Sequence, residues 1–137
     1  MYRKIIVPVD LGHADKIEKA LAVSADLARH YHAELHYVGV TTSAPGAVAH
    51  NPAEFAEKLK AFAAEQGAAR GVDIQADAVT SPDPVRDLDD TLRRTVDELG
   101  ADLVVMASHV PGFADHIFSS NAGYLASHAS VSVLVVR

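Results

Sequence analysis

The residues best suited to binding chemistry in this sequence stand beside apolar segments. They are Asp10, directly after the apolar run at residues 5–9; Ser108 and His109, after the run at 103–107; and Ser119, Ser120 and Asn121, ahead of a small-and-apolar helical pattern. A carboxylate accepts hydrogen bonds, and an imidazole titrates near neutral pH. Ser and Asn side chains with free backbone N–H groups at a helix start form a natural anion site.

Each of these residues also has a structural interpretation. Asp10 is equally suited to cap or turn the chain before a helix. A His after a strand is more often held by backbone groups than used in catalysis, and Ser108 with His109 lacks the G-x-S-x-G turn of a hydrolase. Neither His109 nor Asp10 has a visible residue to orient it for activating water. We therefore expect no catalytic residue.

The apolar pattern predicts the elements that position these residues. Strands are expected at 5–9, 35–40, 74–79, 103–107 and 131–136. Helices are expected at 17–31, from 55 to near Gly71, from Pro82 and Pro84 to Gly100, and at 122–129. A loop rich in Ser, Pro, Gly and Ala, from Thr41 to Pro52, has the length of a functional or flexible segment.

Strands that alternate with helices predict one α/β domain over residues 1–137 with a parallel sheet and right-handed crossovers. The first and fourth strands are the most hydrophobic and should be central, which a sheet order of 3-2-1-4-5 provides; the weaker third strand fits an edge. Ligands bind such sheets at the carboxyl ends of the strands, where the winding reverses. This point would gather Val9 with Asp10, Val40 with Thr41, and the chain from Ala107 onward.

Composition excludes several classes of protein. With 137 residues, 49% hydrophobic and 22% charged, the chain is neither disordered nor fibrous. The net charge is −6 (12 Lys and Arg, 18 Asp and Glu), whereas proteins that bind nucleic acid usually carry a basic patch and a high isoelectric point. The absence of Cys excludes disulfides, thiolate metal sites and thiol chemistry. No apolar run is long enough for a signal peptide or a membrane span, so we expect a cytoplasmic protein with no membrane partner.

Three segments together resemble the universal stress protein family. They are KIIVPVD at 4–10, LVVMASH at 103–109, and the stretch from Ala122 to Arg137 that ends in VLVVR. The likeness covers essentially the whole chain and implies a single-domain, three-layer α/β/α sandwich of the Rossmann-like, adenine nucleotide α-hydrolase-like type. It also implies a stress-response module that is usually dimeric and binds ATP or another adenine nucleotide, with or without Mg²⁺. Because no residue is placed to activate water, we expect at most a slow ATPase.

The family's nucleotide motif, G-x2-G-x9-G-[ST], is altered here. Ala107 and Val110 stand where glycines are expected. The sequence instead is similar to a branch of short members that reads A-S-H-x-P followed by G-S-N-A, although Ser119 replaces that glycine. Glycines let backbone N–H groups approach phosphates closely, and Pro111 contributes no N–H. These departures favour an alternative, a nucleotide-free stress protein that acts by protein–protein interaction.

By resemblance, the adenine would lie between the end of the first strand and Val40, and the phosphates would reach the helix start at 119–121. The residues implied in binding are Pro8, Val9, Asp10, Val40, Met106, Ala107, His109, Val110, Ser119, Ser120 and Asn121. No metal site is expected. The last strand, from Val131 to Val136, has an apolar pattern without Lys or Pro, which predicts a homodimer paired through this edge. A regulatory protein partner is also expected, and its identity is open.

Overall fold

The chain alternates strands and helices throughout, as the apolar periodicity predicts. The computed structural model describes residues 1–84, 86–108 and 116–137, and of residues 116–121 it describes the backbone alone. In chain order the elements are β1 (Lys4–Pro8), the 3-10 helix η1 (Leu11–Lys16), α1 (Glu18–Tyr31), β2 (Glu34–Thr41), α2 (Pro52–Arg70), β3 (Ile74–Thr80), α3 (Leu88–Leu99), β4 (Leu103–Ala107), α4 (His116–His128) and β5 (Ser132–Val136).

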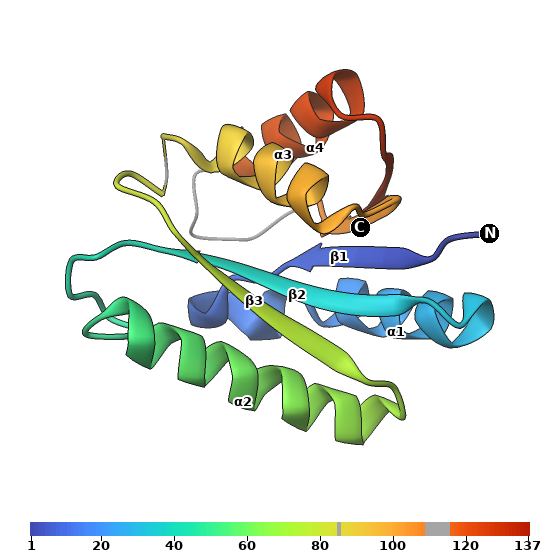
Figure 1. Ribbon diagram of the computed structural model, residues 1–137, viewed down its shortest axis with the longest axis horizontal. Helices are drawn as coiled ribbons and strands as arrows, with labels where there is room; N and C mark the ends of the chain where they lie inside the picture. The colour runs from blue at the N-terminus through green and yellow to red at the C-terminus, as the bar shows by residue number, and fades with distance from the viewer. Residues whose placement is uncertain (85, 109–115) are drawn as a thin grey trace.

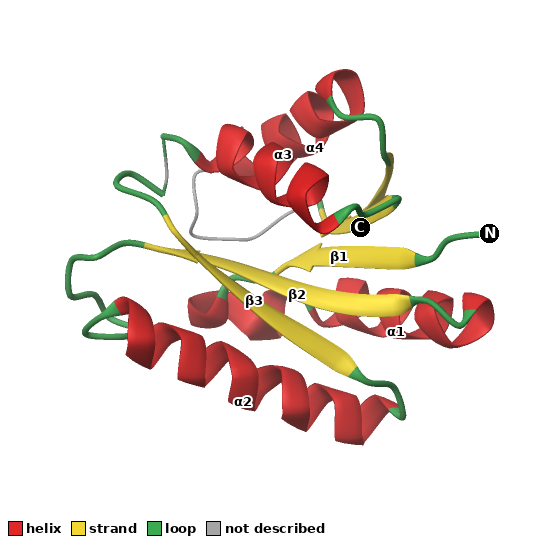
Figure 2. Ribbon diagram, viewed as in Figure 1, coloured by secondary structure: helices red, strands yellow, loops and turns green. Residues whose placement is uncertain are grey.

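The five strands form one parallel sheet in the order β3-β2-β1-β4-β5, which confirms the predicted topology. Helices α1 and α2 cover one face, and α3 and α4 cover the other (Figures 1 and 2). Strands β1 and β4 are central, and every residue of β4 is buried. A strand covered on both faces must be apolar at every position, which explains the uninterrupted apolar runs in the sequence.

The core is split by the sheet into two clusters. Ile5 and Val7 of β1 point toward α1 and α2, whereas Ile6 of β1 points toward α3 and α4. Side chains along a strand alternate between the faces, so neighbouring residues of one strand serve different clusters. Among the described helices, none is long and apolar enough to span a membrane.

Helices α2 and α3 end at Gly71 and Gly100, the two glycines at which the sequence predicts helix ends. Gly71 and Gly100 adopt φ values of 67° and 68°, in the left-handed region that favours glycine. Their N–H groups donate to carbonyls of the last helical turn. The chain can therefore reverse directly into β3 and β4.

The starts of three helices differ from the prediction. Helix α2 begins at Pro52, three residues before the expected start at 55, and Asn51 caps it. Helix α3 begins at Leu88 and not at Pro82 or Pro84. Before it, Asp83 accepts hydrogen bonds from the backbone N–H of Arg86 (3.1 Å) and, through its carbonyl, from that of Asp87 (2.9 Å). This turn takes the place of a first helical turn because a residue before proline disfavours the helical conformation.

Helix α4 begins at His116, six residues earlier than the predicted start at Ala122. Residues 116–121 contain neither Gly nor Pro, so nothing in this stretch breaks a helix. The prediction that residues 119–121 form the helix start was therefore wrong.

Candidate functional site

A cavity of about 260 Å³ lies at the carboxyl ends of β1 and β2, where the winding of the sheet reverses. Pro8, Val9 and Asp10 line it from the end of β1, and Val38, Val40 and Thr41 line it from β2. This position agrees with the prediction from strand order.

Two segments outside the sheet complete the walls. On one side lie residues from the 41–49 loop and Phe55 of α2; on the other lie Pro84 with Leu88 and Leu92 of α3. The loop is held by a hydrogen bond from the Gly46 N–H to the Ala49 carbonyl (2.9 Å) and by the Lys58 ammonium on the Val48 carbonyl. The lining is mostly apolar and suits an apolar group.

The main chain of Val40 faces this cavity. In β2 the carbonyl of Val38 accepts from the Val9 N–H (2.8 Å), so Val38 points its backbone groups toward β1. The carbonyl of Thr41 accepts from the Ser81 N–H, on the β3 side. Backbone groups alternate in direction, so those of Val40 point the same way as those of Val38. The register of β1 with β2 ends at Pro8 opposite Val38, which leaves Val40 facing the space beyond β1.

Asp10 caps the 3-10 helix that follows β1. Its Oδ1 accepts from the Gly12 N–H (3.0 Å), and its Oδ2 lies 2.9 Å from His13 Nδ1. The structural interpretation of Asp10 is therefore confirmed. Asp10 also lines the cavity, where it is the one ionisable residue among the described lining residues. The Asp10 carboxylate thus borders the cavity, while its oxygens contact Gly12 and His13 in η1.

Two further carboxyl groups stand near the cavity on α2 and α3. The pKa of Glu54 is lowered, first by the hydrogen bond from the His50 backbone N–H and then by the His50 side chain. The pKa of Asp89 is raised by burial and by the neighbouring charge of Asp90. Neither side chain lines the cavity.

The structure brings together four of the residues implied in binding, Pro8, Val9, Asp10 and Val40. Met106 and Ala107 are buried in β4 and do not line the cavity. His109 and Val110 lie outside the described residues. Ser119 is the fourth residue of α4, and in α1, α2 and α3 the N–H of the fourth residue already donates to the carbonyl of the residue before the helix. Ser119, Ser120 and Asn121 therefore lie inside the helix and not at its start.

Sequence reasoning missed the walls contributed by Phe55, Leu88 and Leu92. Their spacing marks them as apolar helix faces, which is the same signal that core residues give. In the described ranges, no three His, Asp or Glu side chains are arranged to hold a metal ion.

The parallel sheet of order β3-β2-β1-β4-β5 with helices on both faces defines a Rossmann-like α/β protein. The sequence model of the universal stress protein family matches residues 1–137. The chain belongs to this family.

Similar proteins carry the same family name. Universal stress protein G of Shigella flexneri is 30% identical over 148 residues, covering 100% of both chains. A universal stress protein solved in complex with cAMP superposes with a TM-score of 0.71 at 22% identity, over 99% of this chain and 97% of the other. The universal stress protein from Archaeoglobus fulgidus in complex with dAMP gives a TM-score of 0.69 at 20% identity, over 99% and 98%. At these identities the two structures establish the fold.

Proposed function

We propose that this protein is a regulatory module that binds an adenine nucleotide in the cavity at the ends of β1 and β2. The observation that carries the proposal is the pairing of an apolar slot with the outward-facing backbone of Val40. Two structural neighbours are described with adenine nucleotides, cAMP and dAMP. The protein would act in the cytoplasm, with the nucleotide as a conformational ligand and hydrolysis slow or absent.

The chemistry of Val40 favours adenine over guanine. A backbone N–H and C=O from one residue offer one donor and one acceptor. Adenine presents the complementary pair, a ring nitrogen that accepts and an exocyclic amine that donates, whereas guanine presents a carbonyl and a ring N–H in the opposite order. A base whose donor and acceptor are in the opposite order leaves buried polar groups without hydrogen bonds, which strongly weakens its binding.

The remaining implied contacts follow from the family resemblance. Pro8 and Val9 would pack on the base, and Asp10 would face the ribose side. The phosphates would lie toward the segment from Ala107 to Asn121. Any Mg²⁺ would arrive with the phosphates of ATP or ADP, where phosphate and water oxygens hold it.

Calorimetric titration tests this proposal. We expect binding of AMP, and of ADP and ATP with and without Mg²⁺, together with at least about tenfold weaker binding of GMP. Ala44 lines the cavity and Ser43 beside it does not, and both are exposed. Ala44→Trp should therefore block binding, while Ser43→Trp should leave it unchanged. The proposal is wrong if millimolar nucleotide gives neither a heat of binding nor a shift in the unfolding temperature.

The exposed strand β5 favours a second candidate, a nucleotide-free protein that acts through protein–protein interaction. Leu134 and Val135 are 37% and 42% exposed, which is high for large apolar side chains at one strand edge. The replacement of motif glycines by Ala107, Val110 and Ser119 supports the same candidate. Chromatography of nucleotide released from the purified protein separates the two, because only the first candidate carries nucleotide.

A further inference from the structure

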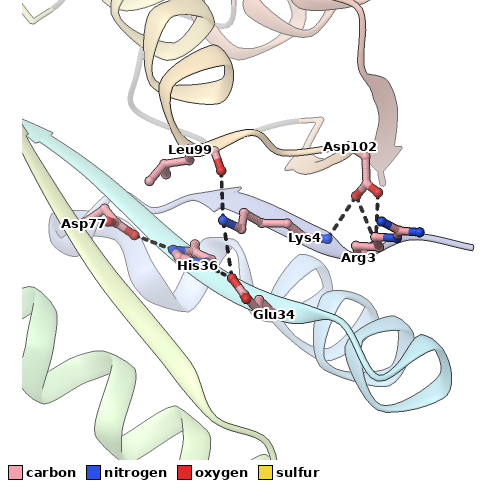
Figure 3. A network of polar contacts seen from close by, with 7 residues as sticks. All are labelled: Arg3, Lys4, Glu34, His36, Asp77, Leu99 and Asp102. Carbon is pink, nitrogen blue, oxygen red and sulfur yellow. Dashed lines mark hydrogen bonds and ion pairs between the residues drawn. The ribbon is translucent and has the colours of Figure 1, made fainter.

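A polar cluster that the cavity does not include lies around His36 of β2. His36 is 8% exposed and lies on the sheet face that also carries Ile6 and Val38. Its Nδ1 is 2.7 Å from Asp77 Oδ2 on β3, and its Nε2 is 3.3 Å from Glu34 Oε2 on β2 (Figure 3). Each ring nitrogen of this buried imidazole therefore meets a different carboxylate.

The two contacts select one protonation state. An ionised carboxylate only accepts hydrogen bonds, and a neutral imidazole has one N–H donor and one acceptor nitrogen. Only the imidazolium donates from both nitrogens. We propose that His36 is a proton-dependent clamp on β3: the imidazolium joins this edge strand to β2 by a charge-assisted hydrogen bond to Asp77, while its second N–H donates to Glu34. Loss of one proton removes the ring's charge, so an N–H that remains on Nδ1 holds Asp77 as a weaker neutral donor and the bare Nε2 faces a Glu34 oxygen.

The positive and negative charges around His36 are equal in number only when the His36 ring is itself protonated. From β1, Lys4 Nζ lies 3.4 Å from Glu34 Oε2 and donates to the Leu99 carbonyl at the end of α3 (2.9 Å). Lys4 and an imidazolium thus oppose the carboxylates of Glu34 and Asp77. On α3 itself, Arg93 is paired with Asp97. The Asp102 carboxylate, after α3, is bound by the backbone N–H groups of Arg3 and Lys4 (Figure 3).

The carboxyl group that faces Nε2 is held in its ionised form. The pKa of Glu34 is lowered, first by the hydrogen bond from His36 and then by Lys4. A depressed carboxyl pKa gives stability above the ordinary pKa of that group, and this stability is lost in strong acid. The two His36 contacts together need a proton on each ring nitrogen and an ionised carboxylate beside each. The clamp should therefore be strongest in mild acid.

The position of the clamp makes β3 the element that responds. β3 is an edge strand that pairs with β2 alone, from Leu35 opposite Ile74 to Thr41 opposite Thr80. Asp77 lies in the middle of this register, opposite Val38. A contact at the centre of β3 stabilises the pairing of this strand with β2, and β3 has no second neighbouring strand to hold it in the sheet.

Urea unfolding at two pH values, together with NMR of the imidazole nitrogens, tests the clamp. Relative to wild type, we expect His36→Gln to raise the unfolding equilibrium constant about tenfold near pH 5.5, and by less than about threefold near pH 8.5. Asp77→Asn should show the same pH-dependent difference. NMR should show both nitrogens of His36 protonated near pH 5.5, and amide exchange should show faster opening of β3 in His36→Gln at that pH.

His50 provides a matched control. Its Nδ1 lies 3.1 Å from a Glu54 oxygen, but its side chain is 81% exposed, so solvent screens the pair. His50→Gln should change the unfolding equilibrium constant by a similar small factor at both pH values. An effect of His36→Gln that is equal at both pH values would overturn the proposal. A single protonated nitrogen on His36 near pH 5.5 would overturn it as well.

Discussion

The close approach of Phe55 to Gly39 shows how a single residue fixes one wall of the cavity. A methyl group on Gly39 would lie 2.8 Å from Phe55 Cζ and 3.1 Å from Leu59 Cδ2. Phe55 and Leu59 are 6% and 0% exposed, so neither side chain has room to withdraw. We expect Gly39→Ala to lower the free energy of unfolding by about 1–3 kcal/mol, measured by urea denaturation.

Gly123 is the control for this substitution. It lies inside α4, and nothing lies within 4 Å of a methyl group placed on it. Gly123→Ala should raise the free energy of unfolding by about 0.5–1 kcal/mol, because Ala is the better helix former. If Gly39→Ala proves as stable as wild type, the packing of Phe55 against β2 is looser than described.

Single residues also show how far the sequence predicts the site. Val9, Asp10, Val40 and Thr41 line the cavity as the strand order predicts, because the carboxyl ends of neighbouring parallel strands meet at one edge. The His36 cluster does not follow from the sequence. Its partner Asp77 is 41 positions away, and the pair forms through the register of β2 with β3, which no local pattern encodes.

At the scale of elements, the start of α2 positions the cavity wall. Asn51 Oδ1 accepts from the Glu54 N–H (2.8 Å), and the Glu54 carboxylate accepts from the His50 N–H (3.2 Å), so the two side chains cap the helix reciprocally. Phe55 stands one residue after Glu54. The cap therefore fixes where Phe55 enters the cavity wall.

Removing this cap tests its contribution. Asn51→Ala should lower the free energy of unfolding by about 1 kcal/mol in thermal or urea unfolding, because the Glu54 N–H loses its acceptor. Asn51→Asp keeps an acceptor oxygen in the same place and should stay within a few tenths of a kcal/mol of wild type. Equal losses in both variants would contradict a capping role.

The sequence predicts the first residues of the helices less well than their last residues. Both helix ends marked by glycine, at Gly71 and Gly100, are found where the sequence places them. The starts of α3 and α4 are not, because a proline permits either a turn or a helix, and because residues 116–118 carry no break signal. The error at α4 matters for function, since it moves Ser119, Ser120 and Asn121 into the helix and removes their N–H groups from any anion site at its start.

At the scale of the whole molecule, the sheet order follows from alternating strands and helices, right-handed crossovers and the hydrophobicity of the central strands. The same order leaves β5 at an edge, paired with β4 alone. Leu134 and Val135 of β5 are exposed, and the strand carries no Lys, Pro or inward charge to prevent further pairing. We propose that two copies pair through the segment from Val131 to Val136 about a two-fold axis.

Sedimentation equilibrium at micromolar concentration tests this dimer. Val133→Pro removes a backbone donor from β5 and should give a monomer or an unfolded chain, so a milder variant is needed beside it. Val135→Lys places a charge on the exposed edge and should give a folded monomer, because pairing would bury like charges from both copies together. Gln75→Lys adds the same charge to the other edge strand, β3, and should leave the dimer intact. A monodisperse wild-type monomer would reject the interface, and dissociation by Gln75→Lys but not by Val135→Lys would place it at β3.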